Sequence, residues 1–303
     1  MTDLVRVVAS LMDSYAVLGY PIQHSLSPVI HNAAFTALRI DAKYYAIEVP
    51  PDSLKTTIED LRRQRYRGWN VTIPHKEHIL PFLDEVDERA QQIGAVNAVV
   101  RIGEQLFGAN TDIDGITKSL APYREKISGA HALILGAGGA ARAAVASLIS
   151  SYHCDQIFIY NRTPVRARKL IDDLAPWARA QGSLLTNIDE NHIAQIMNRV
   201  TCVVNASSAG MHPHVNELPV KSLNFWASRA SPQDSVVVLD LVYNPLQTRF
   251  LQEAEKAGAQ TVNGMDVLIY QAMYSFLLWT GKPFPFDLAK EVALRELHNR
   301  SMV

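Results

Sequence analysis

The segment ALILGAGGAARAA, at residues 132–144, constrains the fold of this chain more than any other stretch. An apolar strand runs into a glycine turn and then into a helix of small residues, which is the pattern of a dinucleotide-binding βαβ unit. In that pattern Gly136 makes the tight turn, Gly138 lets the backbone approach a pyrophosphate, and Ala141 lets the helix pack closely on the sheet. A tight βα turn without a ligand is the alternative interpretation, because the glycine pattern alone is a weak signal.

The end of the next expected strand, at residues 157–160, indicates which cofactor the turn binds. Asn161 lies 25 positions after Gly136, where an NAD enzyme usually carries an acidic residue for the ribose 2′-hydroxyl. Arg162 and Arg166 follow instead, and their guanidinium groups suit the additional phosphate of NADP. The sequence therefore predicts NADP, with NAD less favoured. Arginines that are only solvated at a helix start are the alternative interpretation.

Strands and helices alternate before the glycine turn as well. They are expected at residues 16–18, 28–38, 44–49 and 54–66. This repeated βα order implies a mostly parallel sheet. Ser27 is the expected N-cap of the first helix, because it precedes Pro28, whose missing N–H costs nothing at the first helical position.

The alternation resumes after the turn. Further strands are expected near residues 157–160, 202–205 and 236–239, and helices at 114–125, 265–279 and 287–298, with a break at residues 281–283. A chain of 303 residues is long enough for about two domains, since single hydrophobic cores stop growing near this length. The sequence therefore predicts an α/β protein of two domains.

Composition excludes several classes of partner. A net charge of -1 gives no broad positive surface for nucleic acid. The two cysteines, Cys154 and Cys202, form neither a disulfide framework nor a metal motif and are expected to be buried, inert thiols. Residues 1–14 carry no secretory signal and no apolar run reaches the roughly 18 residues of a membrane span, which predicts a cytoplasmic protein without a membrane partner.

Polar side chains follow several strands of the first half. They are Ser25, Ser27, Thr72, Lys76, Asn97 and Asp112. Because ligands of α/β sheets bind at the carboxyl ends of the strands, these side chains are expected to converge. Hydroxyls, an amide, a carboxylate and one ammonium suit a small acid with several hydroxyl groups, and no metal-ligand spacing accompanies them. Turn formation or capping is the alternative for each residue taken singly.

The chain resembles the shikimate dehydrogenase family, including its quinate/shikimate dehydrogenase relatives, from Gly19 to about Pro285. The resemblance rests on nine segments that occur in the family's order: GYPIQHSLSPVIHN, NVTIPHK, GAVNAV, GANTDIDG, GAGGAARA, NRTPVR, NASSAGM, DLVYNP and NGMDVLIYQA. Nine ordered matches are far more specific than any single one.

This resemblance implies the fold, the reaction and the site. The fold would be an N-terminal α/β substrate domain of residues 1–113 and 265–303, and an NADP-binding Rossmann-like domain of residues 114–264, with a central cleft. The reaction would be the reversible NADPH-dependent reduction of 3-dehydroshikimate to shikimate, a step of aromatic amino acid biosynthesis. Lys76 would be the catalytic acid/base, and Asp112 would orient it. The other implied site residues are Ser25, Ser27 and Tyr243 for the substrate carboxylate; Thr72, Asn97, Asp112 and Gln271 for its hydroxyls; and Gly136, Ala137, Gly138, Gly139, Ala140, Asn161, Arg162, Thr163, Arg166, Leu241 and Gly264 for NADP.

Several alternatives stay open. Burial beside Val71 and Ile73 is expected to favour the neutral amine of Lys76, whereas Asp112 favours the ammonium. Asp266 departs from the apolar residue usual in the biosynthetic enzymes, so a quinate/shikimate dehydrogenase that uses NAD is one rival. A sensor that binds cofactor and metabolite without catalysis is another, since Rossmann folds host unrelated functions. The sequence leaves a monomer and a homodimer equally open.

Overall fold

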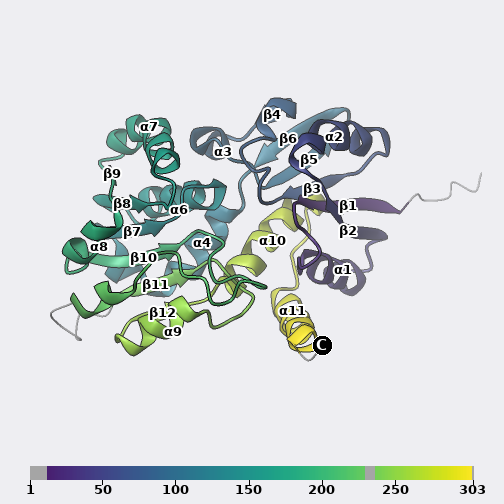
Figure 1. The fold of residues 1–303 in the computed structure, drawn as a ribbon. Coiled ribbons are helices and arrows are strands. Elements are labelled where there is room, and N and C mark those ends of the chain that lie inside the picture. The colour runs from purple at the N-terminus through teal and green to yellow at the C-terminus, as the bar shows by residue number, and fades with distance from the viewer. Residues whose placement is uncertain (1–11, 229–235, 302–303) are drawn as a thin grey trace, which may run out of the picture.

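The chain is described by a computed structural model, which covers residues 12–228 and 236–301 (Figure 1). Residues 1–11 lie outside the described residues. They include most of residues 1–14, for which the sequence predicts no secretory signal. Two lobes lie side by side, and each contains one six-stranded sheet flanked by helices.

The first lobe holds a mixed sheet. Its order is β2-β1-β3-β5-β6-β4, with β1 (Asp13–Gly19), β2 (Ala42–Glu48), β3 (Gly68–Val71), β4 (Glu85–Val86), β5 (Ala98–Ile102) and β6 (Gln105–Ala109). Strand β1 is parallel to β2 and β3, as predicted, but β5 is antiparallel to β3 and β6. The antiparallel part follows from a tight turn between β5 and β6, where Gly103 takes a positive φ of 63°.

Helices cover both faces of the first sheet. Its helical elements are α1 (Ser27–Ala37), η1 (Pro51–Ser53), α2 (Leu54–Arg63), η2 (Leu80–Phe82) and α3 (Glu88–Ile93). Successive residues of β1 point to opposite faces, so Ala16 and Leu18 pack in one apolar cluster, and Tyr15 and Val17 in another. The sheet is therefore buried on both sides.

The predicted serine N-cap of α1 is wrong. The helix already begins at Ser27, the residue before it is Leu26, and no side chain caps this end. Ser25, which lies outside the helix, accepts at its Oγ a hydrogen bond of 3.2 Å from the backbone N of Ser27. Pro28 occupies the first turn of α1, as expected.

The second lobe has the predicted parallel sheet. Its order is β12-β11-β10-β7-β8-β9, with β7 (His131–Leu135), β8 (Gln156–Tyr160), β9 (Leu184–Asn187), β10 (Val200–Asn205), β11 (Val237–Asp240) and β12 (Gln260–Val262). Its helical elements are α6 (Gly139–Ser150), α7 (Pro164–Ala180), α8 (Glu190–Ile196), η4 (Asn224–Ser228) and α9 (Arg249–Lys256). This doubly wound order is that of the Rossmann fold.

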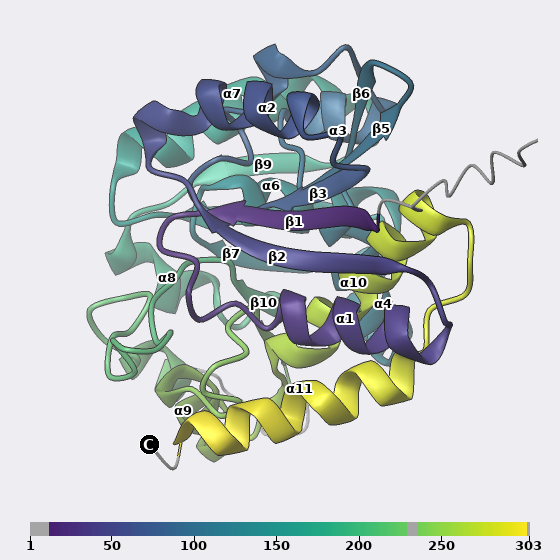
Figure 2. The ribbon, with the colours of Figure 1, turned by 90° about the vertical axis from the view of Figure 1, so that its right-hand side faces the viewer.

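The remaining helices follow β6 and β12. The helix predicted at residues 114–125 is divided into α4 (Asp112–Leu120), η3 (Ala121–Tyr123) and α5 (Arg124–Ile127), and Pro122 lies at the start of the 3-10 turn. The predicted C-terminal helices are α10 (Gly264–Thr280), which ends at Gly281 with φ 65°, and α11 (Phe286–Ser301). Figure 2 shows α10 and α11 returning to the first lobe beside α1.

Candidate active site

Lys76 and Asp112 form a nearly buried ion pair. The Nζ of Lys76 donates to Oδ2 of Asp112 at 2.6 Å, and 13% of each side chain is exposed. The second oxygen of Asp112, Oδ1, accepts from Nδ2 of Asn97 at 2.8 Å. Asn97 thus fixes the carboxylate, and the carboxylate fixes the ammonium. These three predicted site residues lie together.

The surroundings of Lys76 differ from the expectation on one point. Val71 is buried, but Ile73 is 54% exposed and cannot shield the amine. The second lobe provides the cover instead: a Cβ placed on Gly139 would lie 2.8 Å from Cβ and 3.1 Å from Cδ of Lys76. A residue of the glycine turn therefore packs directly on the lysine side chain.

A buried polar network, which sequence reasoning missed, supports this pair from behind. Tyr44 donates through its hydroxyl to Asn70 at 2.7 Å, and Asn70 donates to Ser275 at 2.9 Å. The Ser275 hydroxyl lies 3.0 Å from that of Thr111, which accepts from Asn97 at 3.0 Å. A continuous chain of hydrogen bonds thus runs from Tyr44 to Lys76. Asn70 begins the NVTIPHK segment and was a detectable candidate, whereas Ser275 gave no local signal.

A second polar cluster lies at the start of α1. Tyr243 reaches it from the second half of the chain and packs with Leu26. Burial raises the pKa of Tyr243, while the Leu26 backbone and the positive charge of Arg300 oppose the rise. Ser25 and Ser27 flank Leu26 in the chain, and the convergence of their hydroxyls with that of Tyr243 stays a prediction.

Gln271 and Thr72 occupy the remaining predicted substrate positions. Gln271 is 8% exposed and donates from Nε2 to the carbonyl of Leu268 at 2.8 Å, which leaves Oε1 as an acceptor for another group. Its helix lies close to α4 because Gly115 has no side chain: a Cβ there would meet the Val267 carbonyl at 2.8 Å. Thr72 lies against Gly19, at the end of β1.

The glycine turn fits a dinucleotide pyrophosphate. Gly136 has a φ of 124°, which disfavours other residues, and the segment after β10 lies against it at Ala206. No described atom lies within 4 Å of a Cβ placed on Gly138, and no side chain caps the start of α6. The open backbone and the free N–H groups of α6 suit phosphate oxygens. Ala141 is fully buried, as its packing role requires.

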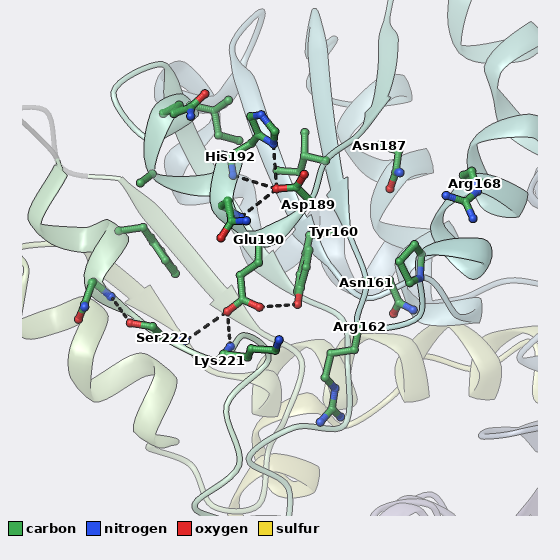
Figure 3. Close-up of a pocket in the computed structure, with 18 residues that line it drawn as sticks. Tyr160, Asn161, Arg162, Arg168, Asn187, Asp189, Glu190, His192, Lys221 and Ser222 are labelled. Carbon is green, nitrogen blue, oxygen red and sulfur yellow. Dashed lines mark hydrogen bonds and ion pairs between the residues drawn. The ribbon is translucent and has the colours of Figure 1, made fainter.

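A cavity lies at the carboxyl ends of β8 and β9, the edge at which Rossmann sheets bind ligands. A hollow of about 1160 Å³ lies beyond β8 and β9 and is lined by Asn161, Arg162 and Arg168 among others (Figure 3). Arg166 and Thr163, which were predicted to contact NADP, are exposed and do not line it. The acidic residue typical of NAD enzymes is absent from position 161, and two guanidinium groups are available for a 2′-phosphate.

Leu241 and Gly264, both predicted to contact NADP, lie against each other. The backbone of Gly264 lies directly on the Leu241 carbonyl, so that a Cβ would collide with it, and the Gly264 N–H donates to Val242 at 3.1 Å. The lobes also meet where the ring of His24 lies 5.2 Å from that of His212. The central cleft stays a prediction, because the described contacts at Gly139 and His24 show the lobes close together.

Other sequence-based expectations concern the whole chain. Both cysteines are free and buried, as predicted, and burial raises the pKa of Cys154 to about 12 and that of Cys202 well above its ordinary value. In the described residues, no three potential metal ligands lie together, and no helix is both long and apolar enough to cross a membrane.

A Rossmann lobe whose glycine turn touches a lysine of a second α/β lobe is an arrangement that suits a two-domain, nucleotide-dependent dehydrogenase. Family models agree: the shikimate dehydrogenase substrate binding domain matches residues 17–99, shikimate / quinate 5-dehydrogenase matches 119–240, and the shikimate 5′-dehydrogenase C-terminal domain matches 264–294. The chain belongs to the shikimate dehydrogenase family.

Individual relatives show the same. The chain is 41% identical to the shikimate dehydrogenase (NADP(+)) of Halothermothrix orenii over 88% of its own length and 90% of the relative's. It resembles the crystal structure of shikimate 5-dehydrogenase from Thermus thermophilus in complex with NADP(H) and shikimate, with a TM-score of 0.79, 33% identity, and coverage of 94% and 99% of the two chains. A quinate dehydrogenase from Corynebacterium glutamicum in complex with NAD gives a TM-score of 0.81 at 27% identity, with coverage of 93% and 99%.

Proposed function

We propose that this chain catalyses the reversible NADPH-dependent reduction of 3-dehydroshikimate to shikimate, a step of aromatic amino acid biosynthesis. The observation that carries the proposal is the Lys76–Asp112–Asn97 cluster, which lies directly against the glycine turn of the nucleotide lobe. The names of the most similar relatives support the same reaction.

The proposed division of labour follows the lobes. Residues 1–113 and 265–303 bind the substrate, and residues 114–264 bind NADP; the family models at residues 17–99 and 119–240 support this division. The hydroxyls around Leu26 bind the substrate carboxylate, and the polar groups near Lys76 bind its ring hydroxyls. The proposed contacts are Ser25, Ser27 and Tyr243 for the carboxylate, and Thr72, Asn97, Asp112 and Gln271 for the hydroxyls.

NADPH, when bound, supplies the hydride that reduces the ketone. The start of α6 holds its pyrophosphate, and Arg162, together with Arg166 or Arg168, binds its 2′-phosphate. The remaining proposed contacts are Gly136, Ala137, Gly138, Gly139, Ala140, Asn161, Thr163, Leu241 and Gly264.

Lys76 completes the reaction by moving a proton. Reduction of a ketone places negative charge on its oxygen, and the ammonium of Lys76 donates a proton to that oxygen; in the reverse direction the amine accepts it from the alcohol. Asp112 holds Nζ in position through the 2.6 Å contact, and Asn97 holds Asp112. A positioned acid of this kind contributes about 10² to 10⁴ in rate.

Initial rates of the purified protein test the proposal. We expect turnover with shikimate and NADP⁺, and with 3-dehydroshikimate and NADPH, to exceed turnover with quinate or with NAD(H). No turnover with any combination would refute the dehydrogenase and leave the non-catalytic sensor.

A quinate dehydrogenase that uses NAD is the second candidate, and the similarity to the Corynebacterium glutamicum enzyme favours it. Asp266, which the sequence offered as a sign of quinate use, forms an ion pair of 2.6 Å with Lys290 of α11. Because this ion pair already accounts for Asp266, the residue gives the quinate alternative less support than the sequence suggested. Faster turnover of quinate with NAD⁺ would establish this alternative. We further propose a cytoplasmic location, which suits two free cysteines, and a monomer or homodimer as the assembly.

A further inference from the structure

Arg142 is a buried cation on α6, the helix that follows the glycine turn. Only 3% of the residue is exposed. Its guanidinium donates to Asp173 at 2.5 Å and to the carbonyl of Ile93 at 2.9 Å, and its Nε forms an ion pair of 3.3 Å with Oε2 of Glu77, without the geometry of a hydrogen bond. A buried guanidinium is costly unless it is paired, and these contacts supply its partners.

The contacts of Arg142 join the two lobes. Asp173 belongs to α7 of the nucleotide lobe, whereas Ile93 ends α3 and Glu77 follows β3 in the first lobe. Figure 1 shows α3 beside α6 and α7, in agreement with their contacts. The Arg142 side chain of the nucleotide lobe therefore contacts two segments of the first lobe, at Ile93 and at Glu77.

One of those segments contains the proposed proton donor. Glu77 is the residue after Lys76, and the Lys76 carbonyl accepts from the Val96 N–H at 2.8 Å. Gly139, three positions before Arg142 on the same helix, packs on the Lys76 side chain. The first turn of α6 thus contacts the side chain of Lys76 and, through Glu77, the backbone that follows it.

We propose that Arg142 is a positioning residue for catalysis: through Glu77 it fixes the Lys76 segment against α6. The lobe that binds the cofactor then also determines where the proton donor lies. This inference rests on the proposed function of Lys76. Arg142 has two carboxylate partners, Glu77 and Asp173. Glu77 is next to Lys76 in the chain and Asp173 is not, so loss of Asp173 tests the stability that Arg142 provides, separately from any effect on Lys76.

The test is a double-mutant cycle with a matched control. Glu77→Gln, Arg142→Gln and the double variant are compared with wild type, and Asp173→Asn is the control, since it removes the other anion of Arg142. We expect Glu77→Gln and Arg142→Gln each to lower kcat about tenfold while KM for both substrates changes little. The double variant should lose no more than the stronger single variant, because the two residues act through each other. Asp173→Asn should lower Tm but keep kcat.

A second readout does not depend on turnover. The rate at which acetic anhydride modifies Lys76, measured by peptide mass spectrometry with Lys118 as internal reference, should change in Glu77→Gln and Arg142→Gln but not in Asp173→Asn. If Arg142→Gln fails to fold, Glu77→Gln alone provides the comparison. Equal Lys76 modification in wild type and Glu77→Gln, or kcat losses that add in the double variant, would overturn the inference. A wild type without turnover would refute the proposed function, and the labelling would still decide the positioning role.

Discussion

At the scale of single residues, Lys76 lies between a carboxylate of its own lobe and a glycine of the other. Replacing it with alanine removes the proton donor but leaves the hydroxyls and amides that bind the substrate. We expect Lys76→Ala to lower kcat at least about a hundredfold, with KM for shikimate changed little, in steady-state assays. Lys118→Ala, an exposed lysine of α4, is the control and should behave as wild type. Near-normal turnover of Lys76→Ala would remove this residue from the chemistry.

Cofactor choice also belongs to this scale. Arg162 lines the cavity beyond β8, so Arg162→Ala should raise KM for NADPH about tenfold or more and leave KM for NADH nearly unchanged, since only NADPH carries the 2′-phosphate. Arg166 is the second phosphate contact predicted from the sequence, whereas Arg168 lines the cavity. The variant, Arg166→Ala or Arg168→Ala, that raises KM for NADPH identifies the second contact. Equal losses for both cofactors in Arg162→Ala would contradict the specificity argument.

His31 gives stability a pH dependence. It is fully buried among aromatic rings, including Tyr44 and Phe276, and neither ring nitrogen has a hydrogen-bond partner among the described residues. Burial lowers its pKa from 6.5 to about 3. Between about pH 6.5 and pH 3, His31 is protonated in the unfolded chain but neutral in the folded chain. The free energy of unfolding therefore decreases by about 1.4 kcal/mol for each unit by which the pH is lowered in this range.

Asp240 acts in the opposite direction. Burial raises its pKa to about 6, so the folded chain binds a proton first, and this contribution to stability grows as the pH falls. The histidine is therefore isolated by comparing wild type with His31→Phe. Between pH 7 and pH 5 we expect the variant to gain about 2 kcal/mol relative to wild type in urea denaturation. A difference that does not vary with pH would show that His31 does not cause the dependence.

At the scale of elements, the approach of α4 to α10 places Gln271 beside Gly115, in the helix that begins at Asp112. A methyl group at Gly115 would press on the Val267 carbonyl. We expect Gly115→Ala to lower the free energy of unfolding by about 1 to 3 kcal/mol and to raise KM for shikimate. Gly138→Ala is the matched comparison: a methyl there meets no described atom, so stability should stay unchanged while KM for NADPH rises. Equal stability of the two variants would contradict the packing argument.

Sequence patterns predicted elements better than the contacts between them. The strands of the second lobe and the turn at Gly136 follow from local signals, because apolar runs and a positive φ depend on neighbouring residues. The turn at Gly103 gave no strong hairpin signal, so the antiparallel strands were missed. Ser275 could not be predicted, since its partner Asn70 lies 205 positions away and only the return of α10 brings them together.

At the scale of the whole molecule, the account places a proton donor and a hydride donor on different lobes. Lys76 lies in the segment after β3 and Asp112 begins α4, the glycine turn joins β7 to α6, and the two regions meet where Gly139 touches Lys76. Sequence motifs named most residues of this site, but the direct contact between the glycine turn and the lysine required coordinates. We therefore propose that residues of the two lobes form one reaction centre.

A crystal structure of the ternary complex with NADP⁺ and shikimate tests this claim most directly. We expect the oxygen of the carbinol group that is to be oxidised to lie within about 3.2 Å of Nζ of Lys76. The nicotinamide should lie on the opposite side of the carbinol carbon, and the pyrophosphate of NADP⁺ should lie at the start of α6. A complex in which Nζ of Lys76 points away from the carbinol oxygen, or in which the nicotinamide lies outside the contact between the lobes, would contradict the account.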